Sequence, residues 1–291
     1  MDLNKSKNNR SYKSSQTGIK NVVINLSKPF ITATQGGLIL NGILDHVLFF
    51  SGQIPNVFPV FKQRINQALK GQENQSNNSW TYHQQTRHLE AAKQTMDQII
   101  EIKDNVIQEF RKTEISEAVI ALGSTIFTVK QAFVIRLPSV DTNHFCVNHE
   151  RANISLVMNL MRSLSMTDEM TKSFDLGSKS TKVFLLLRKP LQSSISMKKD
   201  QNEFFTSMSG FQLPSKCKTT CMEIVLQSTS IIENTESCCK LMKVCSDISN
   251  ISLTDGSFNE IENFNNLNQV KYDWFISTIP IKGLKQNESA I

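Results

Sequence analysis

The segment VKYDWFISTIPIKGLKQ, residues 270–286, indicates how this chain of 291 residues closes its fold. Aromatic side chains crowd its first half, and apolar residues alternate through its second half. The forty residues before it are polar, and a tail next to such a stretch is usually frayed. We expect the segment to dock as a strand on a sheet edge, anchored by Trp274 and Phe275. An ordinary last strand of a core would be buried in the same way, so burial alone does not separate the two interpretations.

Strands and helices are predicted by the periodicity of the chain before this segment. Apolar residues recur at helical spacing over residues 36–50 and 86–112, and the second helix has one buried stripe. That stripe contains Leu89, Met96, Ile99, Val106 and Phe110. EAVIALG, residues 117–123, is continuously apolar and predicts a strand buried on both faces. FVIRLP, residues 133–138, alternates, with Phe133 and Ile135 on one side.

Further elements follow towards the C-terminus. Residues 152–170 predict a helix whose core stripe is Val157, Leu160 and Leu164. Strands are expected in residues 180–190, ended by Pro190, and in residues 218–229, where Cys221 is expected in the core. At the other end, residues 21–30 predict an edge strand.

This order of elements favours an α+β fold, with helices packed on one face of a largely antiparallel sheet. We expect a single domain over residues 19–291. Residues 1–18 are polar and are expected to be disordered. Residues 230–269 are rich in Ser, Asn and acidic residues and are expected to form a polar inserted loop.

Composition limits the possible environments and partners. The chain is 39% hydrophobic with a net charge of +6, and its basic residues form no long run. A solvated surface explains this charge better than a nucleic-acid interface, so no nucleic-acid partner is expected. No apolar stretch has the length of a membrane span, and the first residues do not have the pattern of a signal peptide. We therefore expect an intracellular, soluble protein.

The chain contains few candidates for a metal site or an enzyme site. Cys217, Cys221, Cys238 and Cys245 have irregular spacing and lack a C-x-x-C pair, which disfavours zinc. His144, Cys146 and His149 form the one local cluster that could bind a metal or build a Cys–His nucleophile. The phosphate-binding, dinucleotide-binding and serine-hydrolase motifs are absent from the sequence. A binding protein without a cofactor, rather than an enzyme, is the favoured hypothesis.

Four blocks, taken in order, resemble the comet family of spindle-assembly-checkpoint adaptors. They are LNGILDHVLFFSGQIPNVFPVFKQ (residues 40–63), FRKTEISEAVIALGSTIFTVKQAFVIRLP (residues 110–138), LVMNLMRSLSM (residues 156–166) and the tail segment. In the tail, Tyr272, Trp274, Phe275, Lys282 and Gly283 fall in the family's Tyr-x-Trp-Phe and Lys-Gly pattern. The likeness covers roughly residues 22–285, with residues 230–269 largely outside it.

The resemblance implies a HORMA-like fold whose C-terminal strand wraps the core. It also implies a non-enzymatic adaptor of the nucleus, cytoplasm and mitotic spindle, which silences the checkpoint. Such an adaptor binds the closed form of the mitotic-arrest-deficient-two protein and presents it to a hexameric AAA+ ATPase. The ATPase then remodels that partner, and the checkpoint complex is disassembled.

The resemblance also assigns roles to individual residues. The family's aromatic contact with the partner aligns with Met161, flanked by Met158, Arg162 and Ser165. The family's polar loop contact with the partner aligns near Phe50, which is apolar in this chain. The nearest residue with a side-chain amide is Gln53. The ATPase contact is expected around Val22, Val23 and Ile24. An exposed Met161 would favour an interface over a place in the core. Other HORMA-like proteins of meiotic-axis or DNA-repair complexes, and a Cys/His metal protein, stay open as alternatives.

Overall fold

The computed structural model describes residues 20–26, 31–72, 80–140, 153–174, 180–191, 203–226 and 271–284. The predicted disorder of residues 1–18, the predicted loop of residues 230–269 and the cluster of His144, Cys146 and His149 lie outside these ranges. In the described part, the helices are α1 (Ala33–Phe50), α2 (Phe58–Gln72), α3 (Trp80–Lys112), α5 (Asn153–Met166) and α6 (Asp168–Thr171). The strands are β1 (Lys20–Leu26), β2 (Glu117–Gly123), β3 (Val129–Arg136), β4 (Lys182–Pro190), β5 (Phe205–Ser207), β6 (Lys218–Leu226), β7 (Tyr272–Ser277) and β8 (Ile281–Lys282).

The strands form one mixed sheet in the order β1-β6-β3-β2-β4-β7-β5, with β8 paired to β4. β6 runs parallel to both β1 and β3, and the remaining pairings are antiparallel. β2 lies between β3 and β4, which explains why its residues from Ala118 to Gly123 are all buried. The predicted α+β fold with a largely antiparallel sheet is confirmed.

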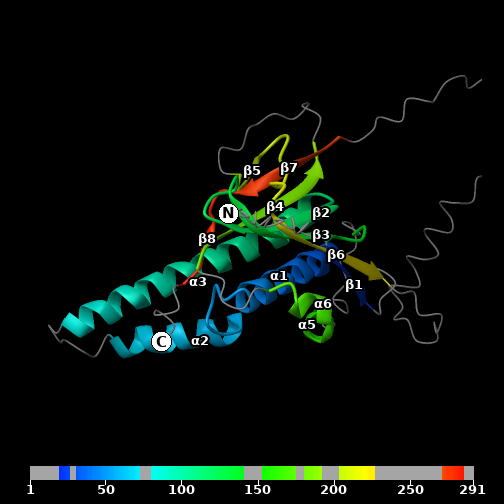
Figure 1. The fold of residues 1–291 in the computed structure, drawn as a ribbon. Helices are drawn as coiled ribbons and strands as arrows, with labels where there is room; N and C mark the ends of the chain where they lie inside the picture. The colour runs from blue at the N-terminus through cyan, green and yellow to red at the C-terminus, as the bar shows by residue number, and fades with distance from the viewer. Residues whose placement is uncertain are drawn as a thin grey trace, which may run out of the picture.

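The helices gather on one face of the sheet (Figure 1). α3 runs along α1, and α5 lies against both α1 and the edge strand β1. A capping box fixes the start of α1: the Thr32 hydroxyl accepts the amide of Gln35 at 3.3 Å, and the Gln35 side chain accepts the amide of Thr32 at 3.2 Å. The five residues of the predicted α3 stripe are all buried in the core.

The opposite face of the sheet is covered by the loop between β5 and β6. Phe211 and Leu213 from this loop pack with Val119 and Leu186 of the sheet. The ring of Phe211 meets the edge of Trp274 with the centroids 5.8 Å apart. Trp274 therefore belongs to this second apolar cluster, and its neighbour Phe275 points to the helix side.

Two predictions about elements need correction. One helix was predicted over residues 152–170, but the structure has two helices there, α5 and α6, separated at Thr167; the buried stripe of α5 is Leu156, Leu160 and Leu164. Val157, which was expected in this stripe, is half-buried because the helix is rotated slightly towards Leu156. Cys221 is also half-buried, since its side chain lies on the face of β6 away from the helices; Cys217 is the buried thiol.

Candidate functional site

An exposed apolar stripe runs along the outer side of α5. Ile154, Met158, Met161 and Ser165 recur at helical spacing on one face, and we call these four residues the α5 stripe. Ile154 is 78% exposed and Met158 is 59% exposed. Arg162 is exposed beside them and donates a 3.5 Å hydrogen bond to Oδ1 of Asn159. Two of the four, Ile154 and Met158, are exposed apolar side chains one helical turn apart, and exposed apolar patches tend to mark contact surfaces.

Met161 occupies the edge of this stripe rather than its exposed centre. α5 approaches α1 closely at Gly42, where an added Cβ would lie 3.1 Å from Cδ2 of Leu160 and 3.9 Å from the sulfur of Met161. Met161 is half-buried and packs against the core. This is not the exposed position that would favour an interface role. Met158 is the more accessible of the two predicted methionines.

Phe50 stands at the end of α1, on the side of that helix that also carries Gly42 and His46. It is 39% exposed, and its ring stacks on those of His46 and Phe174, with centroid distances of 4.2 and 5.5 Å. We call His46, Phe50 and Phe174 the aromatic cluster. Burial disfavours the charged imidazole and lowers the pKa of His46 to about 4.

Gln53 is buried and cannot offer its side chain to a partner. Its Oε1 accepts a hydrogen bond from the Thr181 amide at 2.9 Å, and its Nε2 donates to the Ser51 carbonyl at 3.0 Å. Both ends of the carboxamide are therefore used inside the protein. Gln53 was predicted as a partner contact; in this structure its side chain has a structural role.

The segment predicted to contact the ATPase forms β1, at one edge of the sheet. Val22 and Ile24 are buried beneath the helices, and Val23 points away from them and is 55% exposed. Successive side chains of a strand point to opposite faces of the sheet, so Val23 cannot share the buried face of Val22 and Ile24. Of the three residues, Val23 alone offers its side chain to a partner.

The tail lies on the sheet as β7, antiparallel to β4, with Phe275 opposite Leu187 and Trp274 opposite Arg188. Tyr272 is half-buried at the start of the strand. Lys189 lies over the ring of Phe275, with its Nζ 4.2 Å from the centroid. The same ammonium group lies 2.9 Å from Oε2 of Glu109 on α3. This partly buried ion pair, which joins β4 to α3, has no local sequence signal because 80 residues separate its partners.

After β7, hydrogen bonds to two separate parts of the chain, α3 and the residue before β4, hold the tail. The Lys282 amide donates to the Gln98 side chain at 3.0 Å, and the Lys282 carbonyl accepts from Thr95 at 2.8 Å. The Gly283 amide donates to the Thr181 carbonyl at 2.9 Å. The positions of Lys282 and Gly283 are thus fixed mainly through their backbone, against α3 and the start of β4.

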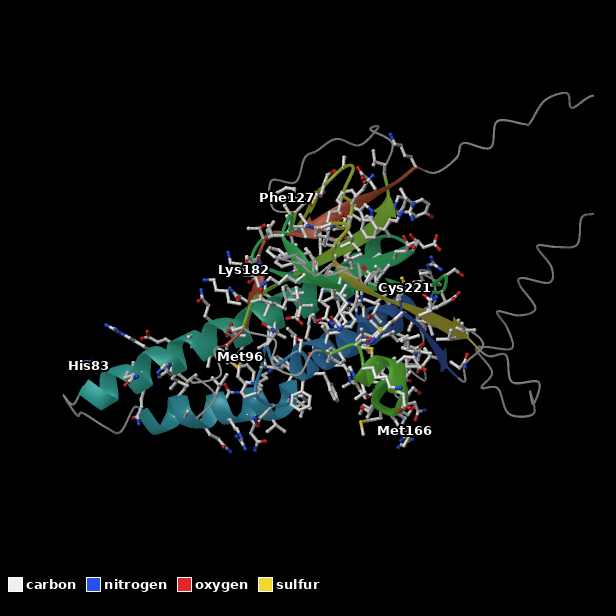
Figure 2. All side chains as sticks on the ribbon, in the orientation of Figure 1. His83, Met96, Phe127, Met166, Lys182 and Cys221 are labelled. Atoms are coloured by element: carbon white, nitrogen blue, oxygen red, sulfur yellow. The ribbon has the colours of Figure 1, made fainter. Side chains whose placement is uncertain are left out.

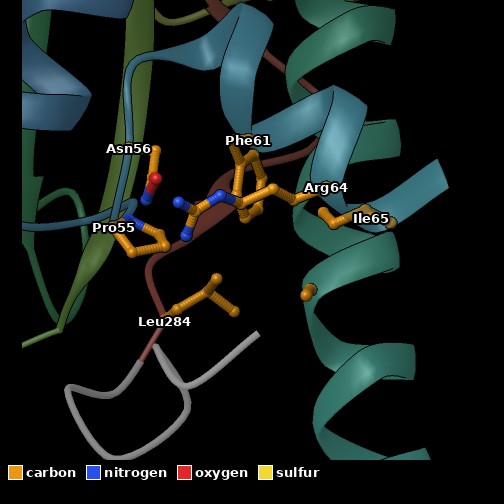
Figure 3. Close-up of a pocket in the computed structure, with 7 residues that line it drawn as sticks. Pro55, Asn56, Phe61, Arg64, Ile65 and Leu284 are labelled. Atoms are coloured by element: carbon orange, nitrogen blue, oxygen red, sulfur yellow. The ribbon is translucent and has the colours of Figure 1, made fainter. Parts of the chain in front are cut away.

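The described part contains a small cavity beside the tail. A cavity of about 10 Å³ lies between α2, α3 and the tail, with Leu284 on one side and Phe61 and Arg64 on the other (Figure 3). It has room for about one water molecule.

The described residues contain no group of three or more His, Cys, Asp or Glu side chains placed to hold a metal ion. Burial raises the pKa values of the Cys217 and Cys221 thiols, so neither is activated as a nucleophile. Cys238 and Cys245, the other members of the considered zinc set, lie outside the described ranges. Among the described helices, none combines the length and the apolar character needed to cross a membrane.

Comparison with known proteins adds no assignment. No model of a known protein family matches the chain, and no curated protein matches it.

Proposed function

We propose that this protein is a non-enzymatic adaptor with a HORMA-like fold that acts in silencing the spindle-assembly checkpoint. In this proposal it binds the closed form of the mitotic-arrest-deficient-two protein and delivers it to a hexameric AAA+ ATPase, in the nucleus, the cytoplasm and on the mitotic spindle. The resemblance of the four sequence blocks to the comet family supports the identity of the partners. The observation that carries a binding role is the α5 stripe, an exposed apolar surface on a helix whose opposite side is buried.

The chemistry of the α5 stripe suits recognition of an apolar protein surface. Burying a side chain of the size of Ile154 or Met158 stabilises a complex by about 1.5–3 kcal/mol. Methionine adapts its shape to a partner more easily than branched side chains do. Arg162 and Ser165 would supply polar contacts at the margin, as is usual around an apolar interface centre. Phe50 would extend the surface along α1.

Met158→Glu tests this proposal without damaging the core. The variant places a charge at an exposed position of the α5 stripe, so binding to the closed partner should weaken by roughly tenfold or more. Met166→Glu is the matched control, because Met166 is 78% exposed on the same helix (Figure 2) but does not share the spacing of the α5 stripe. Binding is measured by titration with purified closed partner, and folding by thermal denaturation.

Equal partner affinity in Met158→Glu and in the wild type would remove the α5 stripe from the proposed interface. Met161→Glu is a poorer choice, because this half-buried side chain packs on the core. A loss of binding in that variant could reflect a loss of folding.

The ATPase contact is placed at Val23 in this proposal. Val23→Glu should reduce ATPase-driven release of the partner while leaving partner binding intact, since Val23 points away from the helices, on the other face of the sheet from α5. An unchanged release rate would remove this assignment.

A further inference from the structure

The carboxamide of Gln53 fills the space that a side chain at position 283 would need. A Cβ added to Gly283 would lie 2.0 Å from Oε1 of Gln53 and 2.9 Å from the carbonyl oxygen of Thr181. The tail can pass this point only because residue 283 is glycine. Next to it, the Leu284 amide donates a 2.9 Å hydrogen bond to the Gln53 carbonyl, and the Leu284 side chain is buried.

Gln53 also holds the end of α1. The Gln53 amide donates to the Leu48 carbonyl at 2.9 Å, and the Gln53 side chain donates to the Ser51 carbonyl. These bonds close the turn that directly follows Phe50. Helix carbonyls at a C-terminus need such partners when the end is buried. Gln53 therefore contacts the tail with one side and the end of α1 with the other.

We propose that Gln53 is a positioning residue that couples the docked tail to the end of α1, and so sets the placement of Phe50. This inference rests on the proposed function, in which Phe50 extends the partner-binding surface. With the tail seated, Gln53 is held at both ends of its carboxamide and at its backbone. Without the tail, the turn after Phe50 loses the Leu284 contact and the burial that makes the Gln53 hydrogen bonds strong.

Amide hydrogen exchange of the isolated protein measures this coupling. Gly283→Ala should displace the tail and speed exchange at Leu284. If Gln53 transmits the change, exchange at Gln53 and Ile54 should also speed up, by roughly tenfold or more. Gly71→Ala is the control glycine variant, because an added Cβ there meets no atom within 4 Å. Gly71→Ala should leave amide exchange at Leu284, Gln53 and Ile54 as it is in the wild type.

A second pair of variants separates coupling from general damage. Gln53→Ala combined with Gly283→Ala removes the nearer obstacle to a Cβ at position 283, so Leu284 should regain part of its protection. If Gly283→Ala fails to fold, Gln98→Ala loosens the tail more gently by removing the acceptor of the Lys282 amide. Exchange at Leu284 and at Gln53 must then rise together.

Faster exchange at Leu284 with unchanged exchange at Gln53 and Ile54 would overturn the coupling. Partner titration is a separate measurement. Failure of the wild-type protein to bind the closed partner would refute the proposed function and leave the exchange result standing. Coupled exchange in Gly283→Ala with wild-type partner affinity would overturn the link from the tail to the binding surface.

Discussion

Acidification from pH 7 to pH 5 is expected to weaken the fold through His46, the buried histidine of α1. Its ring is enclosed by the packing of α1 and stacks on Phe50, and its Nδ1 has no hydrogen-bond partner in the described part of the chain. Because the folded protein disfavours the charged imidazole, its pKa falls from 6.5 to about 4. Between these values the unfolded chain binds a proton that the folded protein does not, so stability falls as the pH falls.

The size of the effect follows from the two pKa values. Each tenfold difference in proton affinity corresponds to about 1.4 kcal/mol, so the folded protein should lose about 2 kcal/mol between pH 7 and pH 5. The neighbouring Asp45 acts in the opposite direction. Burial raises the pKa of Asp45, although Lys103, with its Nζ 2.6 Å from Oδ2, opposes the shift. Protonation of this carboxyl group at low pH therefore favours the folded state.

A substitution isolates the contribution of the imidazole. His46→Phe keeps an aromatic ring against Phe50 but cannot bind a proton. Urea denaturation at pH 7 and at pH 5 should show that the wild type loses about 2 kcal/mol more than His46→Phe over this interval. Equal losses in the wild type and in His46→Phe would refute the reasoning.

Two further predictions concern packing between distant segments. Lys189→Met should lower the free energy of unfolding by about 1–2 kcal/mol, because Glu109 loses its nearest cation but keeps Lys112, whose Nζ lies 3.2 Å from Oε1. Adding Glu109→Gln to Lys189→Met should recover part of this loss. If chemical denaturation shows that the double variant loses the sum of the two single-variant losses, the two side chains do not stabilise each other. Gly37→Ala should destabilise the protein by about 1–3 kcal/mol, because its Cβ would lie 3.0 Å from Cα of Ile107 on α3. Gly71→Ala should instead raise stability by about 0.5–1 kcal/mol, since it adds a helix-favouring residue in open space, and equal melting temperatures for the two alanine variants would contradict this contrast.

The sequence predicted the elements whose signals are local. The spacing of apolar residues in α3 follows from the geometry of a helix with one buried face, so periodicity identified its core residues. The continuous apolar run of β2 likewise indicated a central strand, because both faces of such a strand are covered. Val157 was predicted in the buried stripe of α5 where the structure has Leu156, because the two residues are adjacent and both are apolar. Only the packing against Gly42 and β1 decides which of them points inward.

The sequence could not predict contacts that depend on the three-dimensional arrangement of distant segments. Gln53 is a polar residue in a loop, and nothing near it in the sequence indicates that Thr181 and Gly283 enclose it. Lys189 and Glu109 each resemble a surface charge until β4 and α3 are placed together. The parallel pairing of β1 with β6 also joins segments almost two hundred residues apart, and strand register between such segments is not encoded locally.

The two parts of the proposed binding surface differ in what holds them in place. Met158 belongs to a helix fixed by its own buried leucines, whereas Phe50 precedes a turn held by Gln53 and, through it, by the tail. Loosening the tail should therefore affect only the contribution of Phe50. The losses of partner affinity in Phe50→Ala and Gly283→Ala should be less than additive, because both act on the same part of the surface. The losses of partner affinity in Met158→Ala and Gly283→Ala should be additive in the double variant, as is usual for independent sites.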